Sequence, residues 1–390
     1  MRILISSIID LEKTTYSRLH YFIEHLLNSG HEVTLVSLRD NWKHNEQRQK
    51  YELMDKINVI YLTDKRHGAI RQKLSVPFKL NKLIPENILK NMDVHLCYNS
   101  FILGYFISKK LKKFGVKTVY DLADDLPELV ATNPQIPKVL RGFAGKFSKF
   151  MLERNLKHAS IIMISAKEFK KSMKISRFRH EVVPNGVSVK KFTPKKVKHK
   201  GFIVGYLGAL REWVDLRPML LAVKELDKNI KILVVGGEED LAKYKSFVKY
   251  HKMEDKVEFT GNVPYSEVPE YLNKMDVATI PFKKNSVTDG TCPLKLVEYM
   301  AMKKPCICSR LNEIKSMVGR RVMYASNKDE WKKGIQKLYN NPELRERMGK
   351  EGREFVEKHY DWEKIGVKME KILKRNSKQQ NKFKNKGSFP

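Results

Sequence analysis

The strongest constraint on the fold is a regular alternation of short apolar runs with longer amphipathic segments. Residues 2–9 (RILISSII) have the composition of a buried strand, and residues 31–38 (HEVTLVSL) are strand-like again. Between them, residues 16–28 place their apolar side chains on one helical face. Repeated strand–helix–strand units predict a parallel sheet with helices on both faces. The expected fold class is therefore α/β.

The alternation occurs twice along the chain. After the turn-forming segment VVPNGV (182–187) and a lysine-rich connector, KKFTPKKVKHK, a new series begins with FIVGYL at 202–207. A chain of 390 residues suffices for two domains. We expect domains at 1–196 and 197–358, a further helix at 359–374 and a basic, disordered tail at 375–390.

The remaining elements follow from the same patterns. Further strands are expected at 58–62, 93–98, 117–121, 160–165, 231–235, 257–260, 277–281 and 305–309. Helices are expected at 218–226, 342–359 and 362–373.

Charge narrows the class of partner. Lys and Arg number 76 against 44 Asp and Glu, a formal net charge of +32. Such an excess predicts an anionic partner, for which nucleic acid, acidic lipid headgroups and phosphate-bearing substrates are candidates. Zinc-finger spacing, an RNP-like aromatic strand and a helix-turn-helix signature are all missing from the sequence, so a nucleic-acid-binding protein is the less favoured class.

Neither a metal site nor a membrane span is expected. Cys306 and Cys308 have C-x-C spacing inside an apolar run, which is the alternation of a strand, and zinc-type spacing does not occur. Apolar runs stay well short of the roughly 18 residues that cross a bilayer, and the N-terminus lacks the layout of a signal peptide. We therefore expect a soluble or peripheral protein in the cytoplasm.

The stretch TDGTCPLKLVEYMAMKKP (288–305) predicts a helix that starts just after a polar loop. Open parallel sheets bind ligands at the carboxyl ends of their strands, and with two such domains we expect the site in a central cleft that both domains face. Pro293 suits a first helical turn, and the amides near 291–294 would point out of the helix start, where anions bind. Leu294, Val297 and Met300 are expected to face the core.

Two interpretations of the charged residues in this stretch remain open. Lys295 and Glu298 lie three apart, on one side of the helix. Either they form an ion pair on a capped helix, or Lys295 binds an anion and Glu298 accepts hydrogen bonds from a diol such as a ribose.

The loop GYLGALREWVD (205–215) follows the first strand of the second series. Gly208 permits a tight turn and close backbone approach, and Arg211 could direct its guanidinium at a phosphate. A surface arginine on a strand–helix loop is the alternative. The glycine spacing is neither that of a nicotinamide site nor that of a P-loop.

Three carboxylates follow a strand of the first series in YDLADDLP (120–127). Asp121, Asp124 and Asp125 could bind an acceptor hydroxyl or receive its proton. Alternatively, one of Asp124 and Asp125 caps the following helix.

Two stretches of the first domain are strongly basic. Residues 65–85 carry six Lys or Arg and no acid, and residues 137–158 carry six against Glu153 alone. In the second stretch, one helical face gathers Val139, Phe143, Phe147, Phe150 and Met151, and the lysines that lie mostly away from it are Lys138, Lys146, Lys149 and Lys157. A basic amphipathic helix is typical of membrane-surface binding, and a core-packed helix with a solvated face is the alternative.

Taken in order, several segments resemble the retaining, nucleotide-sugar-dependent glycosyltransferases of family 4, which have the GT-B fold. The segments are VVPNGVSVKKF, FIVGYLGALREWVD, VEFTGNVPYSEVPEYLNKMDVATIPF, the 288–305 stretch and the closing HYDWEKIGVKMEKIL. The resemblance implies two Rossmann-like domains, of which the first binds the acceptor and the second the nucleotide sugar. It also implies that the last helix, at 359–374, crosses back onto the first domain.

The resemblance also implies roles for individual residues. Glu298 is similar to the second glutamate of the family's E-x7-E signature, which holds the ribose. Gly290 stands at the position of the first glutamate, and a carboxylate occurs one residue earlier, at Asp289. The lysine that the family has downstream of its arginine is missing, so we expect Arg211 and Lys295 to share the diphosphate.

Further contacts and departures follow from the same resemblance. Donor contacts are implied for Gly208, Val263, Asp289, Gly290, Thr291 and Leu294. The YDLADD acids lie where the family meets its acceptor, with Asp125 as the catalytic candidate. The family's glycine-rich loop after the first strand is replaced by Ser6, Ser7 and Ile8.

The function implied is transfer of a sugar from a nucleotide diphosphate sugar to a lipid-linked or cell-surface glycan acceptor, with retention of anomeric configuration. Such an enzyme of the hexosyltransferase type needs no metal or other cofactor. Same-face attack, with the leaving phosphate taking the acceptor's proton, needs no dedicated nucleophile. The basic stretches add an anionic membrane surface as an expected partner, with the protein peripheral on the cytoplasmic face. Another GT-B enzyme, such as a sugar-nucleotide epimerase, is the alternative.

Overall fold

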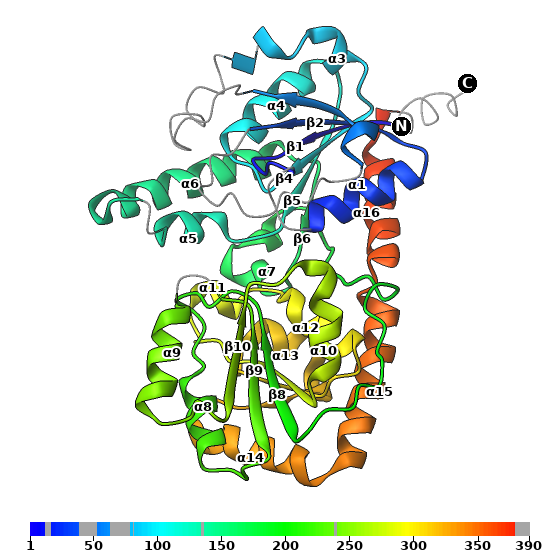
Figure 1. Ribbon diagram of the computed structural model, residues 1–390. Helices are drawn as coiled ribbons and strands as arrows, with labels where there is room; N and C mark the ends of the chain where they lie inside the picture. The colour runs from blue at the N-terminus through cyan, green and yellow to red at the C-terminus, as the bar shows by residue number, and fades with distance from the viewer. Residues whose placement is uncertain are drawn as a thin grey trace. The chain divides into compact units, whose positions relative to one another are not determined.

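The computed structural model describes residues 1–11, 17–38, 53–62, 79–80, 82–133, 136–237 and 240–378 (Figure 1). The chain divides into two compact units, one formed by Met1–Pro184 with Ile365–Pro390 and the other by Asn185–Lys364. The division falls inside the VVPNGV turn, whereas the composition of the connector predicts a boundary at 196/197.

The first unit is built on a parallel sheet. Its strands have the order β3-β2-β1-β4-β5-β6-β7, so the direction of winding reverses between β1 and β4. The strands are β1 (Arg2–Ser6), β2 (Glu32–Ser37), β3 (Asn58–Tyr61), β4 (Val94–Tyr98), β5 (Thr118–Leu122), β6 (Ile161–Ile164) and β7 (His180–Val182). The strand patterns found in the sequence of this unit are confirmed, and β7 is an additional, partly exposed edge strand.

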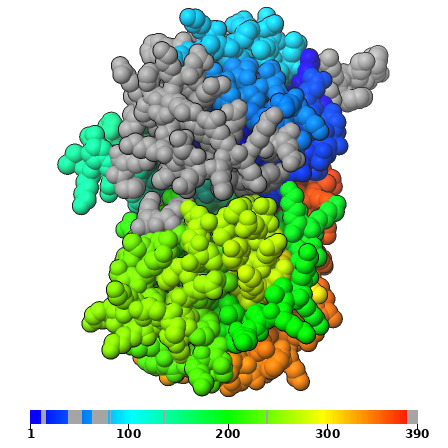
Figure 2. Space-filling view, in the orientation of Figure 1, coloured from blue at the N-terminus to red at the C-terminus, as the bar shows by residue number. Residues whose placement is uncertain are grey.

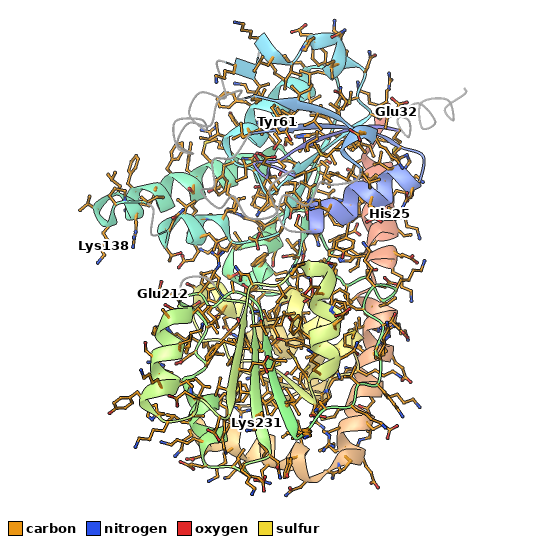
Figure 3. All side chains as sticks on the ribbon, viewed as in Figure 1. His25, Glu32, Tyr61, Lys138, Glu212 and Lys231 are labelled. Carbon is orange, nitrogen blue, oxygen red and sulfur yellow. The ribbon has the colours of Figure 1, made fainter. Side chains whose placement is uncertain are left out.

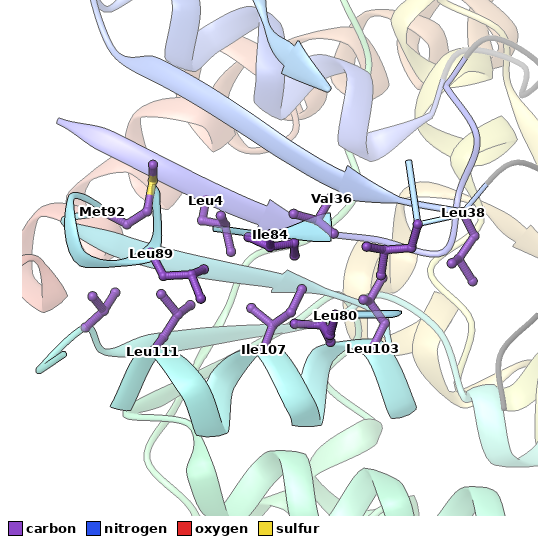
Figure 4. Packing of buried hydrophobic residues seen from close by; sticks show 12 residues of the cluster. Leu4, Val36, Leu38, Leu80, Ile84, Leu89, Met92, Leu103, Ile107 and Leu111 are labelled. Carbon is purple, nitrogen blue, oxygen red and sulfur yellow. The ribbon is translucent and has the colours of Figure 1, made fainter. Parts of the chain in front are cut away.

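Helices cover this sheet and carry its core. They are α1 (Arg18–Asn28), α3 (Glu86–Lys90), α4 (Ile102–Lys113), α5 (Leu126–Ala131), α6 (Lys138–His158) and α7 (Phe169–Ser172), with short 3-10 turns at Met54–Lys56 and Ile175–Arg177. Figure 4 shows α4 packing Leu103, Ile107 and Leu111 against Leu4 of β1 and Val36 of β2. These residues are buried almost completely.

The C-terminal helix α16 (Trp362–Asn376) enters the first unit at Ile365. Glu370 accepts hydrogen bonds at 2.9 Å from Nε2 of His25, a residue of α1 that Figure 3 labels, and from His31 Nε2. A Cβ on Gly366 would lie 2.5 Å from His25 Cγ, so glycine permits this close approach. The expected return of the last helix is confirmed, and the helix extends to Asn376, into the segment expected to be a tail. Residues 379–390 of that tail lie outside the described part.

The basic helix expected at 137–158 is α6, and only part of its apolar face packs against the rest of the unit. Met151 is buried, but Val139, Phe143, Phe147 and Phe150 are exposed. A core-packed helix is therefore wrong as a description of these four residues. Most of the other basic stretch, 65–85, lies outside the described residues.

The second unit repeats the architecture with a sheet of order β10-β9-β8-β11-β12-β13, again parallel. The strands are β8 (Phe202–Leu207), β9 (Ile230–Val235), β10 (Val257–Gly261), β11 (Val277–Ile280), β12 (Cys306–Cys308) and β13 (Met323–Tyr324). Winding reverses between β8 and β11. The C-x-C pair lies in a fully buried strand, as its alternation predicts.

The helices of the second unit pack on both faces of this sheet. They are α8 (Arg217–Lys224), α9 (Leu241–Tyr250), α10 (Val268–Lys274), α11 (Ser286–Asp289), α12 (Leu294–Ala301), α13 (Asn312–Val318), α14 (Lys328–Asn340) and α15 (Pro342–His359), with 3-10 turns at Tyr265–Glu267 and Gly319–Arg321. Loops after β8 and β11 lie at the reversal point, where doubly wound sheets bind ligands.

Candidate active site

Helix α12 carries the two charged residues that the sequence singles out, and its last turn is anchored to two other elements. It begins at Leu294, and Pro293 is its N-cap. On the sheet side, Leu207 N at the end of β8 donates to the buried Tyr299 Oη at 2.8 Å. In the same turn, Ala301 O accepts a hydrogen bond of 2.7 Å from Arg353 Nη1 of α15. The positions of Lys295 and Glu298 are thereby fixed relative to the carboxyl end of β8.

Three glycines follow or end adjacent strands and bring their backbones together. We call Gly208, Gly236 and Gly261 the glycine shelf. Gly208 N donates to Val235 O, and Gly236 N donates to Gly261 O, each at 2.8 Å. The φ angles of Gly208 and Gly236 are +124° and +114°, and a Cβ on Gly236 would lie 2.5 Å from Gly208 O. Only glycine fits both positions without strain.

The ammonium of Lys295 stands over this shelf. A Cβ on Gly208 would lie 2.6 Å from Lys295 Nζ. The ammonium donates to Tyr206 Oη at 3.0 Å, and its distances to the ring centroids of Tyr206 and Phe282 are 4.4 Å and 5.1 Å. Loss of water around the ammonium of Lys295 lowers its pKa to about 7. The negative charge of Glu298 acts in the opposite direction and raises this pKa, but its effect is smaller.

Glu298 has a separate partner. Its side chain is 6% exposed, and Oε1 accepts a hydrogen bond of 2.8 Å from Tyr265 Oη. Burial raises the pKa of Glu298, and the Tyr265 hydrogen bond and Lys295 oppose this rise. Within the described residues, no ion pair joins Lys295 to Glu298. The simple ion-pair interpretation of the 288–305 stretch is therefore wrong. Val263 lies two residues before Tyr265, in the loop after β10.

The loop after β8 is held against neighbouring loops by its backbone. Leu210 N donates to Gly237 O at 2.6 Å, and Lys283 N, after β11, donates to Trp213 O at 2.8 Å. The guanidinium carbon of Arg211 lies 5.8 Å from the centroid of the Trp213 ring. Arg211 is thus on a constrained loop at the reversal point of the sheet, and its contact with a phosphate stays a prediction.

The residues just before α12 have local structural roles. Both carboxylate oxygens of Asp289 accept hydrogen bonds from Asn312, at 2.7 Å from the backbone N and 2.6 Å from Nδ2, at the start of α13. Thr291 Oγ1 donates a hydrogen bond to Val287 O at 2.5 Å. Gly290, which precedes Thr291 in the sequence, is buried. Asp289 therefore links the end of α11 to the start of α13.

The apolar side of α12 is partly as expected. Val297 and Met300 are buried. Leu294 is 36% exposed, so its expected place in the core is wrong. The physical reason is that Leu294 is the first helical residue: side chains of a helix point towards its N-terminus, and no preceding turn exists there to pack against Leu294.

The acids of YDLADDLP belong to the first unit. Asp121 is fully buried and pairs with Arg18 through two bonds of 2.8 and 2.9 Å. Asp125 Oδ1 accepts from Glu128 N at 3.2 Å and caps α5, which confirms the capping interpretation for one of the two candidates. Asp124 accepts from Asn99 Nδ2 at 3.1 Å. Burial raises the pKa of the half-buried Asp125. Loss of water around the carboxyl group also raises the pKa of Asp124, although the residue as a whole is exposed.

Sequence patterns did not single out four residues of this site: Tyr206, Tyr265, Gly236 and Gly261. The glycines were visible as strand-end glycines, which was a usable signal. The tyrosines come from other strands and loops, and nothing in the spacing of α12 points to them. In the described part of the chain, no group of three or more His, Cys, Asp or Glu could hold a metal ion. No described helix is long and apolar enough to cross a membrane.

With this geometry established, the comparisons with known proteins are informative. Residues 189–355 match the family model of glycosyl transferases group 1. The chain is 26% identical over 231 residues to an uncharacterized glycosyltransferase of Methanocaldococcus jannaschii, covering 58% of this chain and 57% of that protein. The match thus spans little more than half of that relative's length.

Two solved structures share the fold over nearly the whole chain. Sucrose-phosphate synthase of Thermosynechococcus elongatus has a TM-score of 0.72 at 15% identity, covering 96% of this chain and 98% of that one. Alr3699/HepE of Anabaena, solved in complex with UDP and glucose, has a TM-score of 0.69 at 14% identity, covering 96% and 100%. The chain therefore has the predicted α/β fold, with two Rossmann-like parallel-sheet domains of the GT-B class. Its residues 189–355 are similar in sequence to the glycosyl transferases group 1.

Proposed function

We propose that this protein is a nucleotide-sugar-dependent glycosyltransferase that transfers a hexose with retention of anomeric configuration. The observation that carries the proposal is the ammonium of Lys295 above the glycine shelf, with Glu298 in the next turn of the same helix. A cation, glycine backbone and a helix N-terminus together suit a diphosphate, and a buried carboxylate one turn away suits a ribose diol.

In this proposal Lys295 and Arg211 stabilise the charge that builds up on the diphosphate as the sugar bond breaks. The stabilisation accelerates the reaction because that charge is larger in the transition state than in the bound donor. Gly290, Thr291 and Leu294, at the start of α12, and Gly208 and Val263 complete the donor contacts. Asp289 is assigned to the sugar side, through the loop that it holds in place.

The acceptor is assigned to the first unit. Asp121 already satisfies Arg18, so Asp124 and Asp125, whose pKa values are raised, are the acids that we propose to meet the acceptor hydroxyl. The leaving phosphate takes the hydroxyl proton, and no metal is required. We propose a lipid-linked or surface glycan as the acceptor, which places the enzyme in polysaccharide biosynthesis, peripheral on the cytoplasmic face of an anionic membrane.

Donor binding provides the test. UDP-, GDP-, ADP- and CDP-sugars are screened for thermal stabilisation of the full chain. We expect one nucleotide class to raise the melting temperature, and Lys295→Ala and Glu298→Ala to abolish that rise. Lys337→Ala and Glu343→Gln, exposed residues of the same unit, serve as charge-matched controls that keep the rise. Absence of stabilisation by every nucleotide sugar, with unchanged activity in both site variants, would overturn the assignment.

A further inference from the structure

Helix α6 exposes an apolar stripe. Its members are Val139, Leu140, Phe143, Phe147 and Phe150, which are 89, 53, 73, 40 and 52% exposed. At 3.6 residues per turn these positions fall within an arc of about 100° and extend over roughly 17 Å of helix. Met151 lies at the edge of this arc and is buried, and the other buried residues of α6, among them Ser148, Leu152 and Asn155, lie on another side of the helix. The α6 stripe therefore does not belong to the core of the first unit.

The helix that bears the stripe is held firmly along its other side. A Cβ on Gly145 would lie 2.9 Å from Ala131 Cβ, so α5 and α6 approach closely at this point. Asn155 Nδ2 donates to Phe101 O at 2.9 Å, which ties α6 to the start of α4. Figures 1 and 2 show the N-terminal end of α6 extending past the sheet of the first unit, and Figure 3 labels Lys138 at the tip of this end.

The helix that bears the stripe is strongly basic. The helix carries Lys138, Arg141, Lys146, Lys149, Arg154 and Lys157. Its one acid, Glu153, is paired with Lys157 at 3.1 Å and with Arg177 at 3.4 Å. The guanidinium carbon of Arg154 lies 5.0 Å from the centroid of the Phe150 ring, at one end of the stripe. Exposed apolar side chains on a strongly basic helix match the boundary between anionic headgroups and acyl chains.

We infer that the α6 stripe is a membrane-insertion surface that enters the boundary region of a bilayer with anionic lipids. A second copy of the chain is a poor occupant, because a symmetric contact would bring the same cations face to face. The inference deepens the proposed function, since it would bring the acceptor-binding unit to a lipid-linked acceptor. Lipid binding itself does not require the donor site to work.

The experiment measures sedimentation of the full chain with phosphatidylcholine vesicles, with and without phosphatidylglycerol. We expect binding that needs phosphatidylglycerol and weakens with salt. The double variant Phe143→Ser with Phe147→Ser should bind about tenfold or more weakly even at low salt, because each change removes a buried ring from the acyl boundary. Tyr250→Ser removes an 82% exposed aromatic from α9 in the second unit and should bind like the wild type.

A second pair of variants separates charge from insertion. Lys146→Ala with Lys149→Ala should weaken binding chiefly at low salt and flatten its salt dependence. Three results would each overturn the inference. The first is unchanged vesicle binding of the phenylalanine variant, and the second is equal binding of the wild type to neutral vesicles. The third is a complex in which another protein or a second copy of the chain covers the α6 stripe. Circular dichroism and donor-induced thermal shift, read on the same variants, show that they are folded. The thermal-shift measurement also distinguishes a failure of the membrane-insertion inference from a failure of the proposed glycosyltransferase function.

Discussion

Lys295 is the residue whose surroundings most distinguish this site from an ordinary helix start. Its ammonium has lost much of its water, and within the described residues no carboxylate forms a salt bridge with it. The Tyr206 hydroxyl and two aromatic rings provide only partial compensation. A partly desolvated cation without a paired carboxylate destabilises the folded protein, but it is well placed to bind an anion.

Donor affinity should therefore depend on pH. Because the pKa of Lys295 is about 7 in the free protein, the ammonium is lost progressively above that pH. The phosphates of a UDP-sugar keep their charge across the same range, so the dissociation constant should rise by up to about tenfold per pH unit above 7. Calorimetric titration between pH 6 and 9 measures this. A flat profile for the wild type would contradict the role of Lys295, and Lys295→Met should be flat and weak.

The same variant should stabilise the free protein. The pKa of Lys295 falls from 10.5 in the unfolded chain to about 7 in the folded one, so between these values the unfolded chain binds more protons. The penalty is complete below pH 7 and disappears as pH rises to 10.5. The melting temperature of Lys295→Met should exceed that of the wild type most at pH 7 or below. A lower melting temperature at pH 7 would show that the ammonium is already satisfied.

At the scale of elements, the site depends on how strand ends meet. The glycine shelf lets the loops after β8, β9 and β10 touch, and α12 is pinned to β8 by Tyr299. In the first unit, Glu370 fixes α16 to α1 through His25 and to the residue before β2, His31. Both arrangements join segments that are distant in sequence, and each gives a prediction.

Gly208→Ala should destroy donor binding as well as stability. Its φ of +124° strains any other residue by about 1–3 kcal/mol, and the new methyl would collide with Lys295 Nζ. Gly30→Ala is the matched control, because φ is +73° there and nothing lies within 4 Å of the new Cβ. Denaturant unfolding should show a loss for both variants, and donor-induced thermal shift should be lost only for Gly208→Ala. Retained donor binding in that variant would remove Gly208 from the site.

Glu370→Gln should loosen α16. Burial alone would raise the pKa of Glu370, but hydrogen bonds from Lys374, His31 and His25 outweigh it and lower the pKa to about 2. This stabilisation is present above the unfolded pKa near 4.5 and is lost as pH falls towards 2. Urea unfolding at pH 7 should show a loss of about 1–3 kcal/mol, and the difference from the wild type should vanish in acid. A difference that persists at low pH would exclude the ionised carboxylate as its source.

At the scale of the whole molecule, the sheets could be predicted because buried parallel strands are uninterrupted apolar runs. FIVGYL became β8 without a change of bounds, and residues 342–359 became α15. The strands β7 and β13 were missed because they are short edge strands whose residues are only partly buried.

The candidate site was only half accessible to sequence reasoning. Lys295 and Glu298 stood out by their spacing on one helix. Their partners Tyr206 and Tyr265 lie 89 and 33 residues away, and strand order alone brings them into contact. For α6, periodicity revealed an apolar face but could not decide whether the protein or its surroundings would cover it.

The central claim is that the second unit binds a nucleotide sugar through Lys295 and Glu298 and that the enzyme retains the anomeric configuration. The most direct measurement follows consumption of the donor by proton NMR and identifies the first anomer formed, in transfer or in slow hydrolysis. We predict a product with the donor's configuration and loss of turnover in Lys295→Met and Glu298→Gln. No consumption of any nucleotide sugar by the wild type, equal consumption by both variants, or inversion at the anomeric carbon would contradict it.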